Sequence, residues 1–253
     1  DRLVKDPTRG VKNPKQAHRN PNALDAKGRA KVAQFIALDP DKPLNVGFAL
    51  AMYMGLREGE ICGLTWKCVD LNEGTVSIER TIGRDGSKWY VKEPKTGGSR
   101  RELYAPSIIA DMLTARLANA KAECLELGVP FDENMYVTGG ADGSFMQPHY
   151  LSHRWRIAAD ALELIGTEGN RPTFHDLRHT FATAAVTAGT DIKTVASMMG
   201  HANAAMTLNI YASADREAKK RGAAVVEQAY MADVAQHAKD GSVIELNRTG
   251  TED

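Results

Sequence analysis

Residues 171–183, which read RPTFHDLRHTFAT, carry the side chains best suited to chemistry. Thr173 with Asp176 three residues later is an acidic variant of the capping box, so we expect a helix to begin here. His175 and Arg178 would share one face of its first turns, where backbone N–H groups and two side-chain donors can meet one anion. The spacing predicts a phosphate-binding site.

A second histidine, His179, stands four residues after His175, which is a spacing that some zinc sites use. The order HDLRH lacks the glutamate that follows the first histidine in metalloproteases, and no third ligand is evident. We therefore expect no metal here, and we interpret His179 as a structural side chain.

Two other stretches contain residue types that act on phosphates. In GLREGE, Arg57 precedes Glu60 by three residues, which by itself indicates an ordinary helix ion pair. Gly200 ends one helix and is followed by His201, and Tyr211 comes ten residues after that histidine. Taken alone, such a histidine is usually a loop residue and such a tyrosine a packing residue.

The elements that position these residues are mostly helical. Helices are predicted from Asp25 to Leu38 and from Pro43 to Leu56, the second apolar on nearly all sides and hence buried. Residues 74–106 change to a period of two with turns at Asp85-Gly86 and Gly97-Gly98, which predicts a three-stranded meander. Further helices are expected at 106–127, 147–165, 173–188, 191–199, 203–213 and 215–236. We predict a mainly α fold with one small three-stranded antiparallel sheet.

The 253-residue chain is 25% charged and 43% hydrophobic, which excludes disordered, collagen-like and disulfide-scaffold classes. Its three cysteines form no CxxC pair, and no apolar run approaches the roughly 20 residues that span a bilayer, so we expect a cytoplasmic protein with no membrane partner. The net charge of zero conceals a gradient. Residues 1–31 hold nine basic and three acidic residues, whereas residues 222–253 hold two basic and six acidic ones.

The combination is more specific than its parts. GLREGE, HDLRHTFAT and a GH dipeptide followed ten residues later by tyrosine occur here in the order typical of the tyrosine recombinases, the phage integrase family. The resemblance covers roughly residues 25–220 and is strongest to integrases of phages and conjugative transposons from Gram-positive bacteria, where TLxxY is common. The chain departs from many relatives at Ser213, where they have histidine, and in GHANAAM, which replaces a serine-rich loop.

The resemblance implies that Tyr211 attacks DNA to form a 3′-phosphotyrosyl link and that a 5′-hydroxyl is released. Arg57 and Arg178 would clamp the non-bridging oxygens, and Lys95, on the turn between the second and third strands, would protonate the 5′-oxygen. The resemblance assigns the supporting roles to other side chains: His175 to proton transfer at the tyrosine, His201 to the phosphate and Glu60 to the first arginine. No metal and no cofactor are required.

The partners implied are double-stranded DNA attachment sites, a homotetramer assembled on them and DNA-bending accessory proteins. Residues 1–22 resemble the exit linker of a missing amino-terminal core-binding domain, residues 23–221 the catalytic domain, and residues 222–253 an acidic terminal helix that docks on its own domain or on a neighbour. The basic candidates for contacts with the DNA backbone are Lys15, Arg19, Lys88, Lys92, Arg100 and Arg101.

Two alternatives remain open. A type IB topoisomerase shares the tyrosine chemistry but usually carries a Ser-Lys pair shortly before its tyrosine, where this chain has Thr207-Leu-Asn-Ile. The second alternative is a DNA-binding module without catalytic activity. The six polar positions that the family uses are all filled, and this favours a recombinase that integrates or excises a mobile element.

Overall fold

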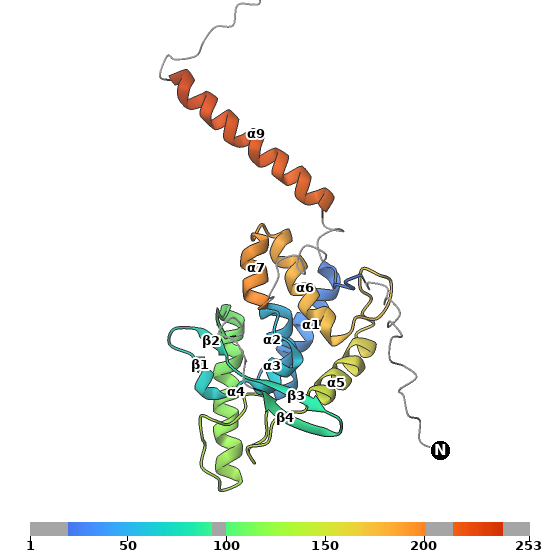
Figure 1. Ribbon diagram of the computed structural model, residues 1–253, viewed down its shortest axis with the longest axis vertical. Coiled ribbons are helices and arrows are strands. Elements are labelled where there is room, and N and C mark those ends of the chain that lie inside the picture. The colour runs from blue at the N-terminus through green and yellow to red at the C-terminus, as the bar shows by residue number, and fades with distance from the viewer. Residues whose placement is uncertain (1–19, 93–99, 201–214, 240–253) are drawn as a thin grey trace, which may run out of the picture.

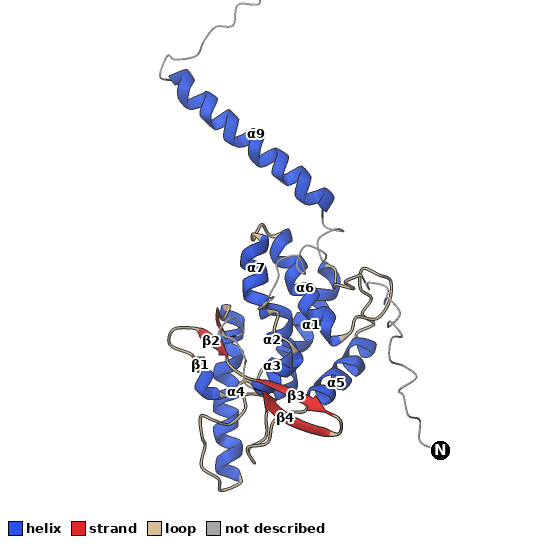
Figure 2. Ribbon diagram, in the orientation of Figure 1, coloured by secondary structure: helices blue, strands red, loops and turns tan. Residues whose placement is uncertain are grey.

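The computed structural model describes residues 20–92, 100–200 and 215–239 of the chain. Helices dominate these residues, and two small groups of strands lie beside them (Figures 1 and 2). The helices are α1 (Ala26–Leu38), α2 (Pro43–Met54), α3 (Glu58–Gly63), α4 (Ser107–Glu126), α5 (Pro148–Ala161), α6 (Phe174–Thr187), α7 (Ile192–Met199) and α9 (Asp215–Lys239), with a short 3₁₀ turn at Trp66–Cys68. The prediction of a mainly α fold is confirmed.

Helix α2 is the centre of the fold, and it packs against α1, α3, α4, α5 and α6. Nine of its twelve residues are buried, as its apolar sequence predicts. It ends at Gly55, whose φ of 68° is the left-handed conformation that glycine adopts without strain. A β-carbon at this position would lie 2.5 Å from the Phe181 ring of α6, so the glycine also permits the close packing of these two helices.

Local capping residues start helices α1 and α6, as the sequence indicates. The Asp25 side chain accepts a hydrogen bond from the Gly28 N–H at 2.7 Å, and Thr173 with Asp176 forms a capping box. Helix α5 ends at Ala161 rather than near residue 165, because the chain turns at Glu163, whose φ is 50°, and buries Leu164. The helix expected at 203–213 lies outside the described residues.

The strands differ from the predicted meander. They are β1 (Val69–Asp70), β2 (Thr75–Ile78), β3 (Thr81–Asp85), β4 (Lys88–Lys92) and β5 (Arg101–Tyr104). An antiparallel sheet has the order β1-β2-β5, and β3 pairs only with β4 in a separate hairpin. The predicted meander is therefore wrong in one pairing: consecutive strands pair in β1–β2 and β3–β4, but β2 pairs with β5 and not with β3. Strand β2 pairs with β5 because Val76, Ile78 and Leu103 are the side chains that bury in the core.

Aromatic side chains join the helices around the functional residues. The rings of Phe48 on α2 and Trp155 on α5 meet edge to face at 5.3 Å, and Phe174 at the start of α6 lies 6.3 Å from Phe48. These contacts fix the start of α6 against α2 and α5. Within the described ranges, no helix has both the length and the apolar character needed to cross a membrane.

Candidate active site

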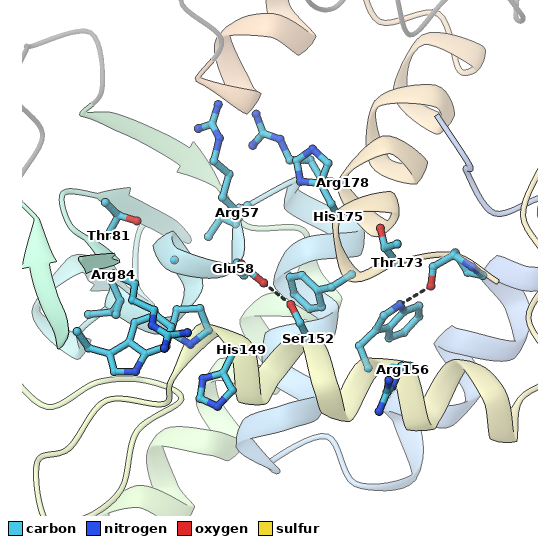
Figure 3. A pocket seen from close by; sticks show the side chains of 18 of the residues that line it. Arg57, Glu58, Thr81, Arg84, His149, Ser152, Arg156, Thr173, His175 and Arg178 are labelled. Carbon is cyan, nitrogen blue, oxygen red and sulfur yellow. Dashed lines mark hydrogen bonds between the residues drawn. The ribbon is translucent and has the colours of Figure 1, made fainter. Parts of the chain in front are cut away.

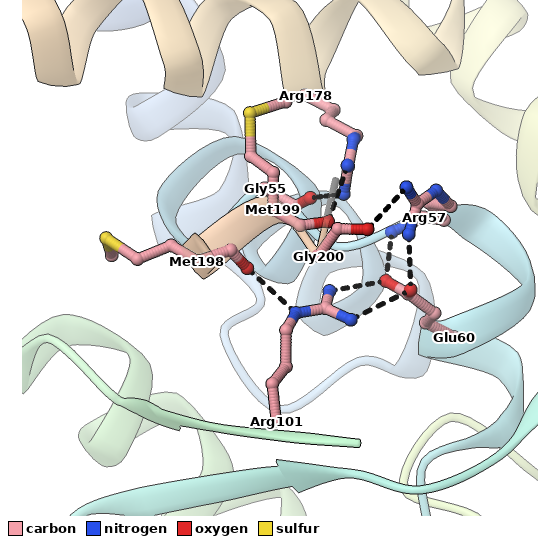
Figure 4. A network of polar contacts seen from close by, with 8 residues as sticks. All are labelled: Gly55, Arg57, Glu60, Arg101, Arg178, Met198, Met199 and Gly200. Atoms are coloured by element: carbon pink, nitrogen blue, oxygen red, sulfur yellow. Dashed lines mark hydrogen bonds and ion pairs between the residues drawn. The ribbon is translucent and has the colours of Figure 1, made fainter. Parts of the chain in front are cut away.

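Three arginines from different elements converge on the carboxyl end of helix α7 (Figure 4). They donate hydrogen bonds to three successive backbone carbonyls, those of residues 198–200. The bonds run from Arg101 Nε to Met198 at 2.8 Å, from Arg178 Nη2 to Met199 at 2.6 Å and from Arg57 Nη2 to Gly200 at 3.2 Å. The last carbonyls of a helix lack partners within the helix and carry the negative end of its dipole. The three guanidinium groups therefore satisfy the end of α7 and hold it in place.

Glu60 on α3 is the carboxylate at the centre of this cluster. Its Oε1 accepts from Arg57 Nη1 at 2.8 Å and from Arg101 Nη1 at 3.0 Å. Its Oε2 accepts from the Arg57 backbone N–H at 2.9 Å and from Arg101 Nη2 at 2.8 Å. Burial alone would raise the pKa of Glu60, but the hydrogen bonds and charge of Arg101, and then those of Arg57, outweigh it and lower the pKa to about 2. The helix ion pair expected between Arg57 and Glu60 is confirmed.

The two arginines that hold Glu60 differ in exposure. The Arg57 side chain is 39% exposed, whereas the side chains of Arg101 and Glu60 are each 9% exposed. Arg101 was expected on the surface as a contact with the DNA backbone, and the structure corrects this: its guanidinium group lies in a buried ion pair. Arg57 is thus the member of the cluster that is open to a ligand.

Arg178 is buried more deeply than its position in the sequence indicated. The residue is 1% exposed, and Nη1 donates to the Gly55 carbonyl at 2.5 Å while Nη2 donates to α7. Burial, followed by the charge of Arg57, lowers the pKa of Arg178 to about 9, so the side chain remains protonated at neutral pH. The expectation that its guanidinium group points freely at an anion requires this correction, although Arg178 still contributes to the lining of the adjacent cavity.

A cavity of about 720 Å³ opens beside this cluster, between α3, the β3–β4 hairpin, α5 and the start of α6 (Figure 3). Its charged lining contains one carboxylate, that of Glu58, which accepts a hydrogen bond from Ser152. The positively charged side chains that line it are Arg57, Arg84, Arg156, Arg171 and Arg178. Such an excess of guanidinium groups favours an anion, and the planar donors of arginine suit the oxygens of a phosphodiester.

Sequence reasoning missed the outer part of this cavity. Trp89 of the hairpin stacks on His149 of α5 with ring centroids 5.4 Å apart, and the Arg84 guanidinium lies 5.4 Å from the Trp89 ring centroid. His149 and Arg156 are seven residues apart on α5, with Ser152 between them on the same face. That helical spacing is the signal in the sequence that could have identified them.

His175 and His179 share one face of α6, as predicted, with ring centroids 4.8 Å apart and planes at 88°. His175 is open to solvent on its cavity side, yet the protein atoms around the ring, followed by the charges of His179 and Arg178, lower the pKa of His175 to about 4. The imidazole is therefore neutral at pH 7. In the part of the chain that the structure describes, no three His, Cys, Asp or Glu side chains are grouped closely enough to hold a metal ion.

The remaining predicted residues divide into two groups. Lys88 and Lys92 are exposed at the two ends of strand β4, and Arg100 is exposed just before β5. The others lie outside the described residues: Lys15, Arg19, Lys95, His201 and Tyr211.

Known proteins of similar sequence are recombinases and transposases. A XerC-like tyrosine recombinase from Caldanaerobacter subterraneus subsp. tengcongensis is 30% identical over 176 residues, which is 65% of this chain and 44% of that protein. The transposase from transposon Tn916 of Enterococcus faecalis is 31% identical over 172 residues, 63% of this chain and 40% of that protein. The chain thus spans about half the length of the curated relatives that it matches.

Among solved structures, the Tn1549 transposon integrase in complex with transposon right end DNA superposes with a TM-score of 0.62 at 24% identity. The match covers 83% of this chain and 67% of that one, and it shows a shared fold. The XerA recombinase is similar with a TM-score of 0.59 at 22% identity, over 81% of this chain and 65% of that one. The model of the phage integrase family matches residues 34–218, most of the chain. The protein therefore belongs to the phage integrase family, the tyrosine recombinases that its motifs resemble.

Proposed function

We propose that the protein is a site-specific DNA recombinase that cleaves and rejoins DNA through a 3′-phosphotyrosyl intermediate, and so integrates or excises a mobile element. The observation that carries the proposal is the convergence of Arg57, Arg178 and His175 on one arginine-rich cavity. These residues come from two sequence motifs more than a hundred residues apart, and all three line this cavity, which supports the proposal. Membership of a family that contains integrases supports the proposal.

In the proposed reaction, the Tyr211 oxygen forms a bond to the scissile phosphorus as the bond from phosphorus to the 5′-oxygen breaks. Arg57 and Arg178 stabilise the charge that develops on the non-bridging oxygens, with help from His201. Neutral His175 accepts the proton of the tyrosine hydroxyl, because its pKa of about 4 leaves the ring unprotonated at pH 7. Lys95 gives its proton to the departing 5′-oxygen.

The covalent intermediate retains the energy of the phosphodiester, so a 5′-hydroxyl from a second duplex can attack it and reverse the step. The proposed partner is double-stranded DNA, and the exposed Lys88, Lys92 and Arg100 are proposed contacts to its phosphates. Solved integrases of the same fold are bound to DNA. Residues 23–221 are the proposed catalytic unit.

We further propose a homotetramer on two DNA sites, with the terminal helix α9 docked on a neighbouring subunit. Its described apolar side chains are more than half exposed, among them Val225 at 63%, Tyr230 at 67% and Val234 at 59%. An exposed apolar helix face gains stability when a partner covers it. DNA-bending accessory proteins complete the proposed assembly.

Covalent capture of DNA tests the proposal. The protein is incubated with fragmented genomic DNA from its source organism, the mixture is denatured with detergent, and DNA that remains attached to protein is sequenced. We expect attached fragments to share one sequence and Tyr211→Phe to yield none. Tyr104→Phe, which changes a tyrosine that is 77% exposed on β5, is the matched control and should yield as many as the parent. A parent that captures no DNA, or a Tyr211→Phe variant that captures as much, contradicts the proposal.

A further inference from the structure

We infer that Arg101 is a positioning residue for the proposed DNA cleavage: it holds Glu60, and through it Arg57, and it anchors the end of α7 from which the segment containing His201 and Tyr211 departs. The inference rests on the proposed function. Arg101 is not among the residues that line the cavity and its side chain is only 9% exposed, so in this proposal it acts through other residues.

The guanidinium of Arg101 uses each of its three nitrogens in this structure (Figure 4). Nε donates to the Met198 carbonyl at 2.8 Å, and Nη1 and Nη2 donate to the two oxygens of Glu60 at 3.0 and 2.8 Å. The two parallel bonds form a fork that fixes the plane of the carboxylate. Lysine has a single nitrogen and cannot reproduce this geometry.

Arg101 leaves the charge of Arg57 available to a ligand. Glu60 carries one negative charge and contacts two guanidinium groups, of which that of Arg101 is buried and that of Arg57 faces the cavity. With Arg101 present, the pair of Arg101 and Glu60 is neutral and Arg57 keeps an uncompensated positive charge. Arg57 already contacts Glu60 at 2.8 Å, so without Arg101 the two would form a neutral pair, which weakens the attraction of Arg57 for a phosphate.

Arg101 also fits closely beneath the end of α7. Gly200 has a φ of 62°, and a β-carbon on it would lie 2.8 Å from Arg101 Nη1. Only glycine combines this backbone conformation with such a close approach. The backbone of Arg101 pairs with Ile78 in the sheet, so the side chain joins α7 and α3 to a strand held by the core.

A double-mutant cycle on cleavage rate tests the inference. The rate of covalent attachment is measured in single turnovers on a nicked duplex of the sequence recovered by covalent capture, for the parent, Arg101→Lys, Arg57→Lys and the double variant. Removing the partner that orients a metal ligand typically costs about 10- to 100-fold, and by analogy we expect Arg101→Lys to slow cleavage by a similar factor. DNA affinity should change less, since Arg101 does not contact the ligand.

The positioning role predicts that the two effects are not additive. Once Arg57 is replaced, Arg101 has lost the group that it positions, so Arg101→Lys should slow the Arg57→Lys protein much less than it slows the parent. Arg154→Lys, a change of the same chemistry at an exposed arginine of α5 that does not line the cavity, is the matched control and should cleave at close to the parental rate.

The dependence of cleavage on pH gives a second readout. Arg101→Gln removes the largest contribution that lowers the pKa of Glu60, so this pKa should rise and the cleavage rate should begin to fall at a higher pH than in the parent. A side chain that only stabilised the fold would not shift this profile.

Each outcome of the cycle decides a different point. A parent that forms no adduct contradicts the proposed function. If the parent forms the adduct but Arg101→Lys cleaves as fast as Arg154→Lys, or if the effects of Arg101→Lys and Arg57→Lys are additive, the positioning role alone is overturned. If both Arg101→Lys and Arg101→Gln fail to fold, Arg101 serves folding and the inference is likewise overturned.

Discussion

Replacing Glu60 by glutamine should destabilise the protein by about 3 kcal/mol at neutral pH. The Glu60 carboxylate is 9% exposed and accepts four hydrogen bonds from Arg57 and Arg101. These lower its pKa from the ordinary 4.5 to about 2. At about 1.36 kcal/mol for each tenfold change in proton affinity, the difference corresponds to about 3 kcal/mol of folding free energy. Glutamine keeps the shape but leaves Arg101 buried without a countercharge, which typically costs a similar amount.

The size of the effect should depend on pH with a definite sign. A carboxylate whose pKa is lowered by folding makes its full contribution to folding free energy at pH values above its pKa in the unfolded chain. This contribution decreases as the pH falls towards the pKa of the carboxylate in the folded protein. The difference in unfolding free energy between parent and Glu60→Gln should therefore be constant above about pH 5.5 and should narrow below pH 4.5. At pH 3, about half or less of the difference in unfolding free energy should remain.

Urea unfolding followed by circular dichroism at several pH values measures this difference. Thermal unfolding at pH 7 should show a fall of about 6–12 °C for a protein of this size. Glu102→Gln changes an exposed carboxylate beside Arg101 in the sequence and is the control, with an expected effect below about 0.5 kcal/mol. If Glu60→Gln is as stable as the parent at pH 7, or if the difference does not narrow in acid, the buried cluster does not stabilise the fold as its geometry indicates.

The other predictions concern the residues around the same cluster. Arg178→Lys should lose one of the two buried hydrogen bonds that Arg178 donates to backbone carbonyls, which should lower the free energy of unfolding by about 2 kcal/mol in urea. An unchanged urea midpoint would contradict the buried position of Arg178. Gly200→Ala should destabilise the protein more than Gly143→Ala, because both glycines have a positive φ but only a β-carbon at Gly200 would lie against Arg101. Equal losses of stability in the two variants would refute this close contact. Covalent attachment of DNA should persist in EDTA, because arginine side chains supply the positive charge in the proposed mechanism. If EDTA abolished the attachment and added Mg²⁺ restored it, this metal-free mechanism would be refuted.

Local signals explain why the helices could be predicted from the sequence. Asp25 and the pair Thr173 and Asp176 cap helices through contacts within three residues, and Gly55 and Gly200 end them through their own backbone conformation. These features do not depend on the rest of the fold. The relative position of His175 and His179 followed from helical spacing for the same reason.

Contacts between distant segments explain what could not be predicted. The strand order depends on which side chains β2 and β5 bury together, and the two-residue strand β1 is too short to show alternation. Arg101 stands between Arg100 and Glu102, a run of charges that indicates the surface, and its partner Glu60 comes near only when the chain has folded. The burial of Arg178 likewise depends on α7, which follows it in the sequence.

The chemical identity of the captured adduct tests the central claim most directly. Protein attached to DNA is digested with protease and nuclease, and the modified peptide is identified by mass spectrometry while the ends of the cleaved strand are labelled. The account predicts a nucleotide joined through its 3′-phosphate to Tyr211, with a free 5′-hydroxyl on the other fragment. Attachment to a different residue, or linkage through a 5′-phosphate, would contradict it.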